Sequence, residues 1–446
     1  MIRAVAALLL LALAATPAAA QVLPACLERP FPATCTPREQ AATRDDWLAQ
    51  RFATILPEAM RAHGVDMWII VAREYVEDPV LSTMLNATSF HARRRTILVL
   101  HDPGPDQPIE RLTVSRYGLA DFFQSAWDPE QQPDQWARLG EIIAARNPAK
   151  IAVNVSPDSA FADGLTKSQY DGVLSAIPEA MRERVAPAHW LAINWLETRL
   201  PDEIAAYRAI VRLAHDLIAE GFSDAFITPG KTTADDVVWR FRARIAELGL
   251  SAWFHPSVDI SRQGVDQPLD GASIIQPGDL LWTDFGITYF GLNTDTQQMA
   301  YVLREGETDA PAGLRAGLKA ANDVQDALTS SFQLGDSGNA ILARARGKAI
   351  AQGLSPSIYS HPIGYHGHGA GASIGFWDNQ NPDPRGEYPL RANTAWSIEL
   401  SATQSVPEWG DQQIAFKVEE DAFFDGTRVD YLDGRQTRFH LIGARR

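Results

Sequence analysis

The chain has 446 residues, of which 46% are apolar and 21% charged, so it can build a large core and wholesale disorder is excluded. At about 100 to 200 residues per domain, this length indicates two or three domains. Its 40 Lys plus Arg against 55 Asp plus Glu give a net charge of −15. This acidic balance disfavours a nucleic-acid partner, because nucleic-acid-binding proteins carry a basic face.

Residues 1–20 are expected to be a secretory signal peptide. Arg3 precedes the apolar run 4–15, and small residues follow before Gln21, which is the order of a cleavable signal. That run is too short to span a bilayer, and no later run reaches about 18 apolar residues, so no transmembrane span is expected in the mature chain. The sequence therefore predicts an exported protein, either periplasmic or extracellular.

Residues 21–40 are expected to form a linker that contains both cysteines of the chain, Cys26 and Cys35. An even number of cysteines in an exported chain favours one disulfide. The alternative is lipid attachment to Cys26, which would anchor the protein without a transmembrane span. Pro24 and the distance from the apolar run make this alternative the weaker one.

Residues 41–195 are predicted to form an α/β domain. A helix over 43–63 is expected to begin with the capping pattern Thr43-x-x-Asp46 and to kink at Pro57. Apolar runs at 67–71, 96–100 and 151–155 are typical of buried strands. No cluster of reactive side chains stands out, so this domain is interpreted as a scaffold or docking domain.

Residues 196–446 are predicted to form an α+β domain. Pro201 opens an apolar stripe of helical period that ends at Gly221, and a second helix follows from Thr232 or Thr233 to Gly249. Beyond residue 255 the pattern is mostly that of strands, with one further helical region at 311–353. This order is typical of helices packed on a mainly antiparallel sheet.

Two aspartates lie on consecutive predicted strands, 280–286 and 293–302, joined by a turn at 289–291. If that turn is centred between residues 289 and 290, Asp284 lies opposite Asp295 on one face, with Cβ atoms about 5 Å apart. Two carboxylates so close repel each other unless a positive charge lies between them.

Three of the ten histidines follow within eight residues, at His361, His366 and His368. The glycines between them allow close backbone approach, so the imidazoles can point into a site. Two glutamates, Glu399 and Glu419, stand in apolar strands where alternation places them opposite the apolar face.

Asp284, Asp295, His361, Glu399 and Glu419 together offer four carboxylates and one imidazole. One divalent ion cannot neutralise four carboxylates, whereas two ions can, and two-metal hydrolytic sites have this composition. Oxygen-rich ligands suit Mn²⁺ best, with Co²⁺ or Zn²⁺ as alternatives.

These residues resemble the metal ligands of the pita-bread metallopeptidases, which include aminopeptidase P, prolidase, methionine aminopeptidase and the non-peptidase creatinase. The order Asp, Asp eleven residues later, His, Glu and Glu is similar to that of the family. Its H-x-x-G-x-x-x-H element is matched from His361 to His368, which implies that His361 binds metal and His368 contacts the substrate. The alternative, metal binding by His368, would need a second histidine where Gly375 stands.

Several positions depart from the family's pattern. The histidine usual about seventeen residues before the first metal aspartate is Gln267, and His255 is a candidate substitute. The family's D-x-T-R element ends in Gln297 and Gln298, and Lys417 replaces an arginine, which keeps the charge and loses bidentate geometry. His255, His366 and Lys417 are candidate substrate-binding residues.

The resemblance implies an α/β N-terminal domain, a pita-bread catalytic domain, and removal of the first residue from peptides with proline in second position. Glu399 and His368 are the expected catalytic residues, as proton acceptor and oxyanion donor respectively. The alternatives are a prolidase-like dipeptidase, a creatinase-like C–N hydrolase, and a non-catalytic peptide- or partner-binding protein. A homo-oligomer is also expected as an alternative to a monomer.

Overall fold

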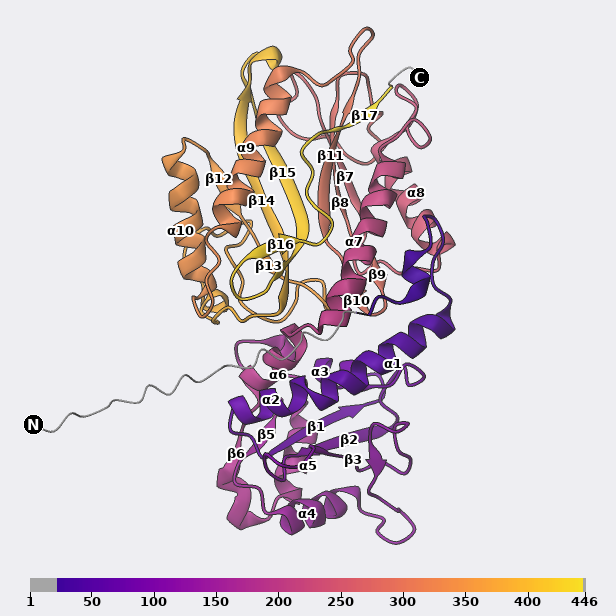
Figure 1. Cartoon of the computed structure of the whole chain (residues 1–446), viewed down its shortest axis with the longest axis vertical. Coiled ribbons are helices and arrows are strands. Elements are labelled where there is room, and N and C mark those ends of the chain that lie inside the picture. Colours follow the sequence, from indigo (N-terminus) through magenta and orange to yellow (C-terminus); the bar gives the residue numbers. More distant parts are fainter. Residues whose placement is uncertain (1–21, 444–446) are drawn as a thin grey trace, which may run out of the picture.

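The computed structural model describes residues 22–443, so the predicted signal peptide at 1–20 lies outside the described residues. Two domains stack along the long axis of the molecule, the N-terminal one below and the C-terminal one above in Figure 1. The predicted combination of an α/β domain with an α+β domain is confirmed. Among residues 22–443, no helix is both long enough and apolar enough to cross a membrane.

The N-terminal domain is built on a mixed six-stranded sheet ordered β4-β3-β2-β1-β5-β6, with helices on both faces (Figure 1). Its strands are β1 (Met67–Arg73), β2 (Arg95–His101), β3 (Glu110–Thr113), β4 (Gln124–Ser125), β5 (Ile151–Val153) and β6 (Val185–Pro187). Its helices are α1 (Pro37–Ala53), α2 (Ile55–Ala62), α3 (Pro79–Met84), α4 (Gln135–Arg146), α5 (Lys167–Ala176) and α6 (His189–Glu197), with 3-10 turns η1 (Ala25–Glu28), η2 (Ala160–Ala162) and η3 (Glu179–Arg184).

Both faces of this sheet are buried, which explains the continuous apolar run in β1. Because side chains alternate between the faces of a strand, Met67 and Ile69 pack with α4 and α5, whereas Trp68 and Ile70 face α1, α2 and α6. Trp68 and Ile70 belong to an apolar cluster that continues without interruption into the core of the C-terminal domain. The two domains therefore share one apolar core.

The first helix begins earlier than predicted. Thr36, not Thr43, caps α1, and its hydroxyl and backbone exchange hydrogen bonds with Glu39 in a capping box, with Pro37 as the first helical residue. The end of the predicted linker 21–40 is therefore helical. The predicted kink at Pro57 is also placed differently. The helix is interrupted at Thr54, and Pro57 lies in the first turn of α2, where its missing N–H costs nothing.

The C-terminal domain consists of a nine-stranded sheet, a short hairpin and four long helices. Its strands are β7 (Ser257–Ser261), β8 (Leu280–Phe285), β9 (Thr288–Tyr289), β10 (Leu292–Asn293), β11 (Thr296–Val302), β12 (Pro356–Ile358), β13 (His361–Pro362), β14 (Thr394–Val406), β15 (Gln412–Phe424), β16 (Val429–Tyr431) and β17 (His440–Ile442). Its helices are α7 (Pro201–Gly221), α8 (Ala234–Glu247), α9 (Ala312–Thr329) and α10 (Gly338–Ala351), with 3-10 turns η4 (Pro384–Gly386) and η5 (Pro407–Trp409).

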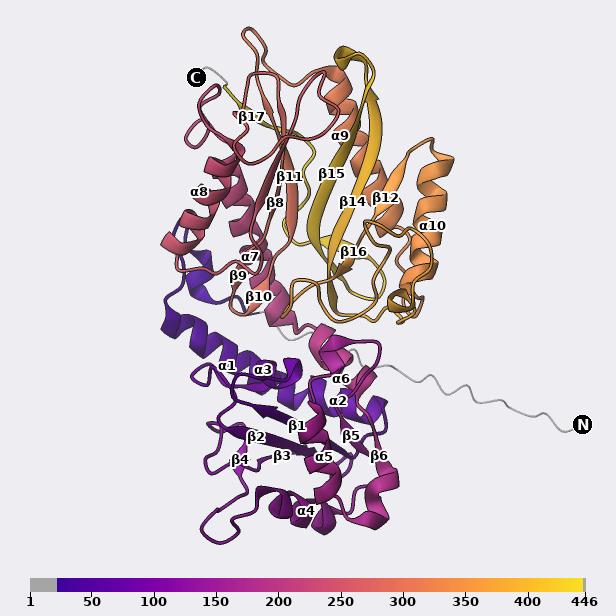
Figure 2. The ribbon, with the colours of Figure 1, turned by 180° about the vertical axis from the view of Figure 1, so that it is seen from behind.

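The sheet order is β12-β14-β15-β11-β8-β7, and the short strands β13, β16 and β17 pair with β14, β15 and β11 respectively. The helices lie on the face seen in Figure 1, and the view from behind in Figure 2 shows the sheet in front of them. In β14, Ile398 faces the helices, and alternation turns Ser397 and Glu399 to the other face. That second face carries the candidate site.

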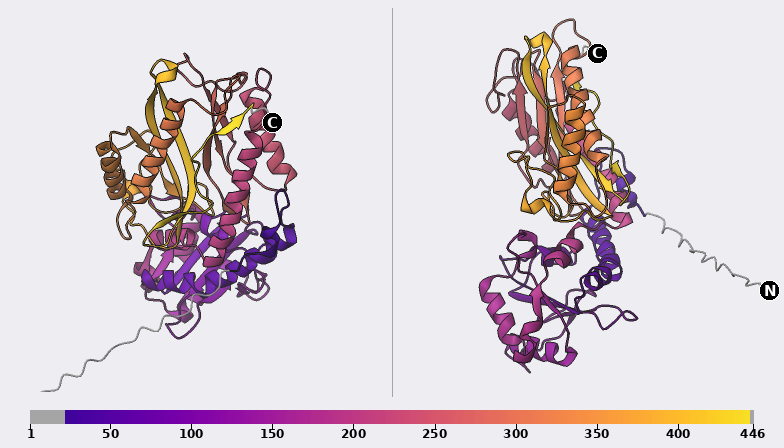
Figure 3. Two further views of the ribbon diagram at one scale, coloured as in Figure 1. Left: turned by 45° about the horizontal axis from the view of Figure 1, so that its top comes forward. Right: turned by 90° about the vertical axis from the view of Figure 1, so that its left-hand side faces the viewer.

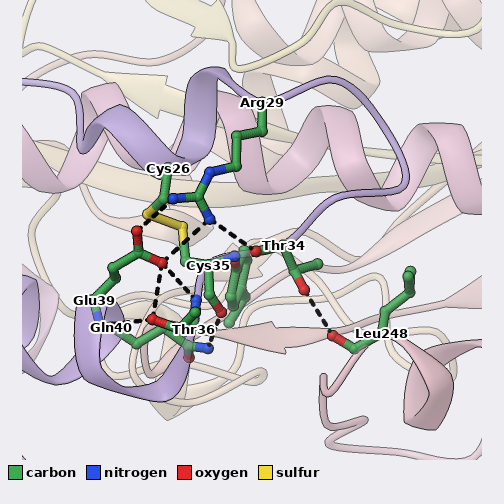
Figure 4. The surroundings of a disulfide bond; sticks show 9 residues. Cys26, Arg29, Thr34, Cys35, Thr36, Glu39, Gln40 and Leu248 are labelled. Carbon is green, nitrogen blue, oxygen red and sulfur yellow. Dashed lines mark hydrogen bonds and ion pairs between the residues drawn. A yellow bond between two sulfur atoms is a disulfide. The ribbon is translucent and has the colours of Figure 1, made fainter.

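The cysteine segment forms the predicted disulfide, between Cys26 and Cys35 (Figure 4). A disulfide-bonded Cys26 has no free thiol for lipid attachment. The Cys35 N–H donates to the Tyr289 hydroxyl at 2.5 Å, and the Thr34 hydroxyl donates to the Leu248 carbonyl at 3.0 Å. The segment thus packs on the C-terminal domain before α1 enters the N-terminal domain, as the side views in Figure 3 also show.

A buried ion cluster joins the domains beside the histidine loop. Arg51 of α1 lies 3.1 Å from the Glu203 carboxylate of α7, and both side chains are fully buried. The Tyr365 hydroxyl donates to the same carboxylate at 2.6 Å, and the Arg51 and Arg199 guanidinium groups lie over the Tyr365 ring. The loop that carries the histidines is therefore fixed to both domains.

Candidate metal centre and substrate cleft

Four polar side chains form one row across the sheet. Glu399 of β14 lies opposite Glu419 of β15, Glu419 lies opposite Gln297 of β11, and Gln297 lies opposite Asp284 of β8. Side chains at matched positions of adjacent strands lie on the same face. Register alone therefore brings carboxylates together that are up to 135 residues apart in the sequence.

The predicted direct opposition of Asp284 and Asp295 is wrong. The hairpin pairs Tyr289 with Leu292, so its turn is centred one residue later than expected and Gln297 takes the position opposite Asp284. Asp295 is two residues from Gln297 and keeps the same face. Oxygen atoms of Asp284, Asp295 and Glu419 still lie within 4.8 Å of one another.

His361 closes the site from the end of the sheet. Its strand pairs with β14, and its Nε2 atom lies 3.7 Å from Asp295, 3.9 Å from Glu399 and 3.7 Å from Glu419. The other ring nitrogen, Nδ1, lies 3.0 Å from the Pro362 carbonyl oxygen, which can only accept. Nδ1 therefore carries the proton, and the Nε2 lone pair points at the carboxylates.

The unpartnered atoms of this cluster fit divalent metal ions. Asp284 Oδ1, Asp295 Oδ1 and His361 Nε2 are buried and have no hydrogen-bond partner among the described residues. Buried polar atoms without partners are rare and costly in folded proteins, unless a ligand or ion satisfies them. The five predicted ligands fall into overlapping groups of three whose ligand atoms lie within 4.8 Å of one another, and Asp295 and His361 also form such a group with His368.

The electrostatics of the cluster agree with this interpretation. Burial raises the pKa of Asp284 to about 6 and, with the charge of Asp284, that of Glu399 to about 8. Burial and neighbouring carboxylates raise the pKa of Asp295 and Glu419 well above the usual range. Burial lowers the pKa of His361 to about 3, which keeps the imidazole neutral. Two divalent cations would allow all four carboxylates to ionise.

Gln297 is a site residue that the sequence analysis listed only as a departure. Its Oε1 accepts from Trp282 Nε1 at 3.1 Å, and its Nε2 donates to Glu399 Oε1 at 2.8 Å. The indole N–H can only donate, so it fixes the orientation of the amide. Glu399 is thus held by one oxygen, and its Oε2 remains directed to the site. Gln297 could have been predicted as a site residue from strand alternation, because it lies two residues after Asp295 and therefore on the same face.

His368 lies at the entrance to the site. Its ring packs edge-on against His361 at 4.8 Å and against Trp253 at 5.3 Å, and the side chain is exposed. The predicted close approach of the glycines is observed: a Cβ at Gly367 would lie 2.4 Å from the Trp253 ring, and one at Gly369 would lie 2.7 Å from the Pro362 carbonyl.

The three predicted substrate-binding residues are distributed differently. Lys417 lies one step along the same face, with its Nζ 3.9 Å above the Trp282 ring, and its charge opposes the rise in the pKa of Asp284 and Glu399. His366 packs against Phe161 at 4.7 Å, at the domain boundary. His255 is exposed beside Arg242 and does not line the cleft.

A cleft of about 810 Å³ runs from His361 and His368 to the N-terminal domain. Both domains line it. Asp158, Phe161 and Trp190 form the N-terminal wall, and Trp190 stacks on Tyr388 of the opposite wall at 4.6 Å. The N-terminal domain, interpreted from the sequence as a scaffold or docking domain, thus also contributes side chains to the cleft beside His361 and His368.

Comparison with known proteins agrees with this architecture. Residues 208–423 match the model of metallopeptidase family M24. No curated protein matches the chain in sequence. X-Pro aminopeptidase from Thermotoga maritima MSB8 superposes with a TM-score of 0.61 at 15% identity, over 86% of this chain and 99% of its own.

Two solved dipeptidase structures have the same fold. Xaa-Pro dipeptidase from Bacillus anthracis gives a TM-score of 0.58 at 16% identity, over 90% of this chain and 99% of its own. Dipeptidase PepE from Mycobacterium ulcerans gives a TM-score of 0.60 at 19% identity, over 89% of this chain and 98% of its own. At such identities these likenesses show a shared fold alone. The family match places residues 208–423, and with them the catalytic domain, in metallopeptidase family M24, and the solved structures show the pita-bread fold of that domain behind an N-terminal α/β domain.

Proposed function

We propose that the protein is an exported two-metal aminopeptidase that releases the first residue from peptides with proline in second position. The observation that carries the proposal is the cluster of five donor side chains, three of them with unpartnered atoms, beside a cleft formed by both domains that His361 lines. M24 membership makes a peptide the expected substrate.

Asp284, Asp295, His361, Glu399 and Glu419 would hold two divalent ions. The ions supply Lewis-acid polarisation of the scissile carbonyl and activation of a water molecule. Four carboxylates and one imidazole suit Mn²⁺, with Co²⁺ or Zn²⁺ as alternatives.

The remaining chemistry belongs to side chains of the cleft. Glu399 accepts a proton from the attacking water, and Gln297 holds its carboxylate in place. His368 stands on the open side of the site, where its ring N–H donates a hydrogen bond to the oxygen of the scissile carbonyl as negative charge develops there. The rings of Phe161 and Trp190 exclude water from the bound peptide.

The size of the cleft favours an aminopeptidase over a dipeptidase. A volume of about 810 Å³ lies in the upper part of the range for small-molecule pockets, so residues beyond the proline can be accommodated. Prolidase-like cleavage of dipeptides is the second candidate, because the fold is shared with a solved Xaa-Pro dipeptidase. A creatinase-like C–N hydrolase and a non-catalytic binding protein remain alternatives.

The test compares substrates of different length. Mn-loaded protein is incubated with Xaa-Pro dipeptides and with Xaa-Pro-Xaa tripeptides, and the products are identified by mass spectrometry. We expect release of the first residue from tripeptides. Cleavage of dipeptides alone would identify a dipeptidase, and no cleavage with two metals bound would identify a binding protein.

Variants show whether activity depends on the proposed site. His361→Ala should lose bound metal, measured by elemental analysis, together with activity. His101→Ala is a matched control, because this imidazole lies beside Glu110 in the N-terminal domain and does not line the cleft. Metal content that is the same in both variants would reject His361 as a ligand.

Export is the part of the proposal that concerns where the protein acts. It is supported by the disulfide between Cys26 and Cys35, since structural disulfides persist in oxidising compartments. Expression of the full chain in bacteria, followed by fractionation and determination of the mature N-terminus, tests it. Cytoplasmic protein that retains residues 1–20 would contradict export.

A further inference from the structure

A second large hollow lies in the N-terminal domain and shares no lining residue with the metal cleft. Its volume is about 1000 Å³. It forms at the edge of the sheet where β1 ends and β2 begins, and it is lined by residues 73–74, 88–96 and 115–119 together with parts of 127–135. Nothing in the proposed peptidase chemistry uses this hollow.

Arginines dominate its lining, in a chain whose net charge is −15. The hollow is lined by Arg73, Arg93, Arg94, Arg95 and Arg116, against a single acidic lining residue, Glu74. Within residues 22–443, only Arg116 of these five has a carboxylate within ion-pair distance, that of Glu130 at 2.8 Å. The other four guanidinium groups have no carboxylate within ion-pair distance among the described residues.

Two of these arginines lie directly opposite each other on adjacent strands of the sheet. Arg73 ends β1 directly opposite Arg95 at the start of β2. Like charges at opposed positions of an antiparallel pair destabilise it. Burial and the charge of Arg73 lower the pKa of the Arg95 guanidinium, and the charge of Asp134 opposes this shift without cancelling it. A bound anion would relieve this repulsion.

Arg95 is also rigidly held by neutral groups. Its Nε donates to Gln169 Oε1 at 2.8 Å and its Nη1 to Gln135 Oε1 at 3.2 Å, while the guanidinium lies 4.6 Å from the centre of the Trp136 ring. These contacts orient the guanidinium without neutralising it. Such a preorganised charge loses little entropy when it binds an anion.

Aromatic side chains surround the charged centre. Phe90 is 82% exposed and Tyr117 is 63% exposed, and both line the hollow together with Trp127. Exposed rings of this kind stack on planar ligand groups. A phosphate offers three acceptor oxygens and almost two negative charges, so it matches several guanidinium forks better than one carboxylate does.

We propose that this arginine hollow binds a small phosphate-bearing ligand with a planar ring, in the class of nucleoside diphosphates. The guanidinium groups of Arg73, Arg93, Arg94 and Arg95 contact the phosphates, and the ring of the ligand stacks against Phe90 or Tyr117. The site is independent of the peptidase function.

Isothermal titration of the metal-loaded protein with ADP tests the proposal, at about 0.15 M salt. We expect a dissociation constant below about 0.1 mM, weaker binding of pyrophosphate, which lacks the ring, and no binding of adenosine, which lacks phosphate. The double variant Arg93→Ala with Arg94→Ala should weaken ADP binding at least tenfold. Arg182→Ala is the matched control, because this exposed arginine of η3 does not line the hollow, and it should leave binding unchanged.

Other outcomes overturn the proposal. ADP binding that survives the double variant would place the phosphates at the metal centre. Triglutamate that binds as tightly as ADP would remove the preference for phosphate. A mass by light scattering that falls from oligomer to monomer in the double variant, with no ADP binding to the parent protein, would identify the hollow as an interface between copies.

Discussion

Removal of metal is expected to make the stability of the protein fall as the pH rises from about 4 to 8. The ordinary pKa values of Asp284 and Glu399 are 3.8 and 4.5, and in the metal-free fold they are raised to about 6 and about 8. A carboxyl group with a raised pKa binds its proton more tightly in the folded state than in the unfolded state. Its contribution to stability is complete below the unfolded pKa and is lost as the pH rises through the folded pKa.

The magnitude follows from the two shifts. Each pKa unit corresponds to about 1.4 kcal/mol, so Asp284 accounts for about 3 kcal/mol and Glu399 for about 5 kcal/mol. The two do not add fully, because the charge of Asp284 is itself one cause of the shift at Glu399. For a chain of this length, a loss of about 5 kcal/mol corresponds to a fall in Tm of roughly 5 °C.

The assay is thermal unfolding of metal-free and Mn-loaded protein at pH values from about 5 to 8. The metal-free protein should lose Tm over this interval, and the stabilisation by metal should grow as protons cease to compete for the ligands. Glu197, whose pKa burial raises to about 8, contributes equally to both forms, so the difference between them isolates the site. Within the site, the lowered pKa of His361 opposes the effect of the carboxyl groups below its ordinary value of 6.5. Glu399→Gln should flatten the profile of the metal-free protein. A metal-free profile that rises with pH, or that is identical in this variant, would refute the reasoning.

Three further predictions concern positioning and stability. Gln297→Leu should weaken metal binding about 10- to 100-fold by isothermal titration, because it releases Glu399, and an unchanged affinity would argue against this role. Arg51→Met should lower the free energy of unfolding in urea by about 3 kcal/mol, because the buried Glu203 carboxylate then keeps only Arg199, at 3.8 Å, as a charged partner, and a loss below about 1 kcal/mol would contradict that. Cys26→Ser should cost about 3 kcal/mol in the same assay, since the disulfide closes a loop with a sequence separation of 9, and equal stability would show that the loop is already ordered when reduced.

Much of the candidate site could be predicted because strands alternate. The patterns around Glu399 and Glu419 predict the face of each glutamate, and the structure pairs the two directly. The turn before Asp295 was misplaced for a local reason. Phe290 and Gly291 both have positive φ, at 55° and 79°, and a phenylalanine in that conformation is uncommon, so the sequence favoured a turn one residue earlier.

Contacts between distant segments could not be predicted in this way. Nothing in the local pattern around Phe161 or Trp190 shows that these rings face the metal cleft, since their positions depend on how the two domains pack. Arg51 and Glu203 pair across 152 residues, and each alone has the pattern of a solvated helix residue. The resemblance to a metalloenzyme family predicted the metal ligands, but it did not predict the aromatic wall of the cleft or the buried ion pair.

The disulfide-bonded segment ahead of α1 has a mechanical consequence. Two bodies joined by one flexible connection can swing apart about it in many directions. Here the chain crosses the domain boundary twice, first from the Cys35 region into α1 and again from α6 into α7. With two separate crossings, the domains can rotate relative to each other only about the line that joins the crossings. The gap between the two cleft walls, where Trp190 stacks on Tyr388, can therefore change by small tilting alone.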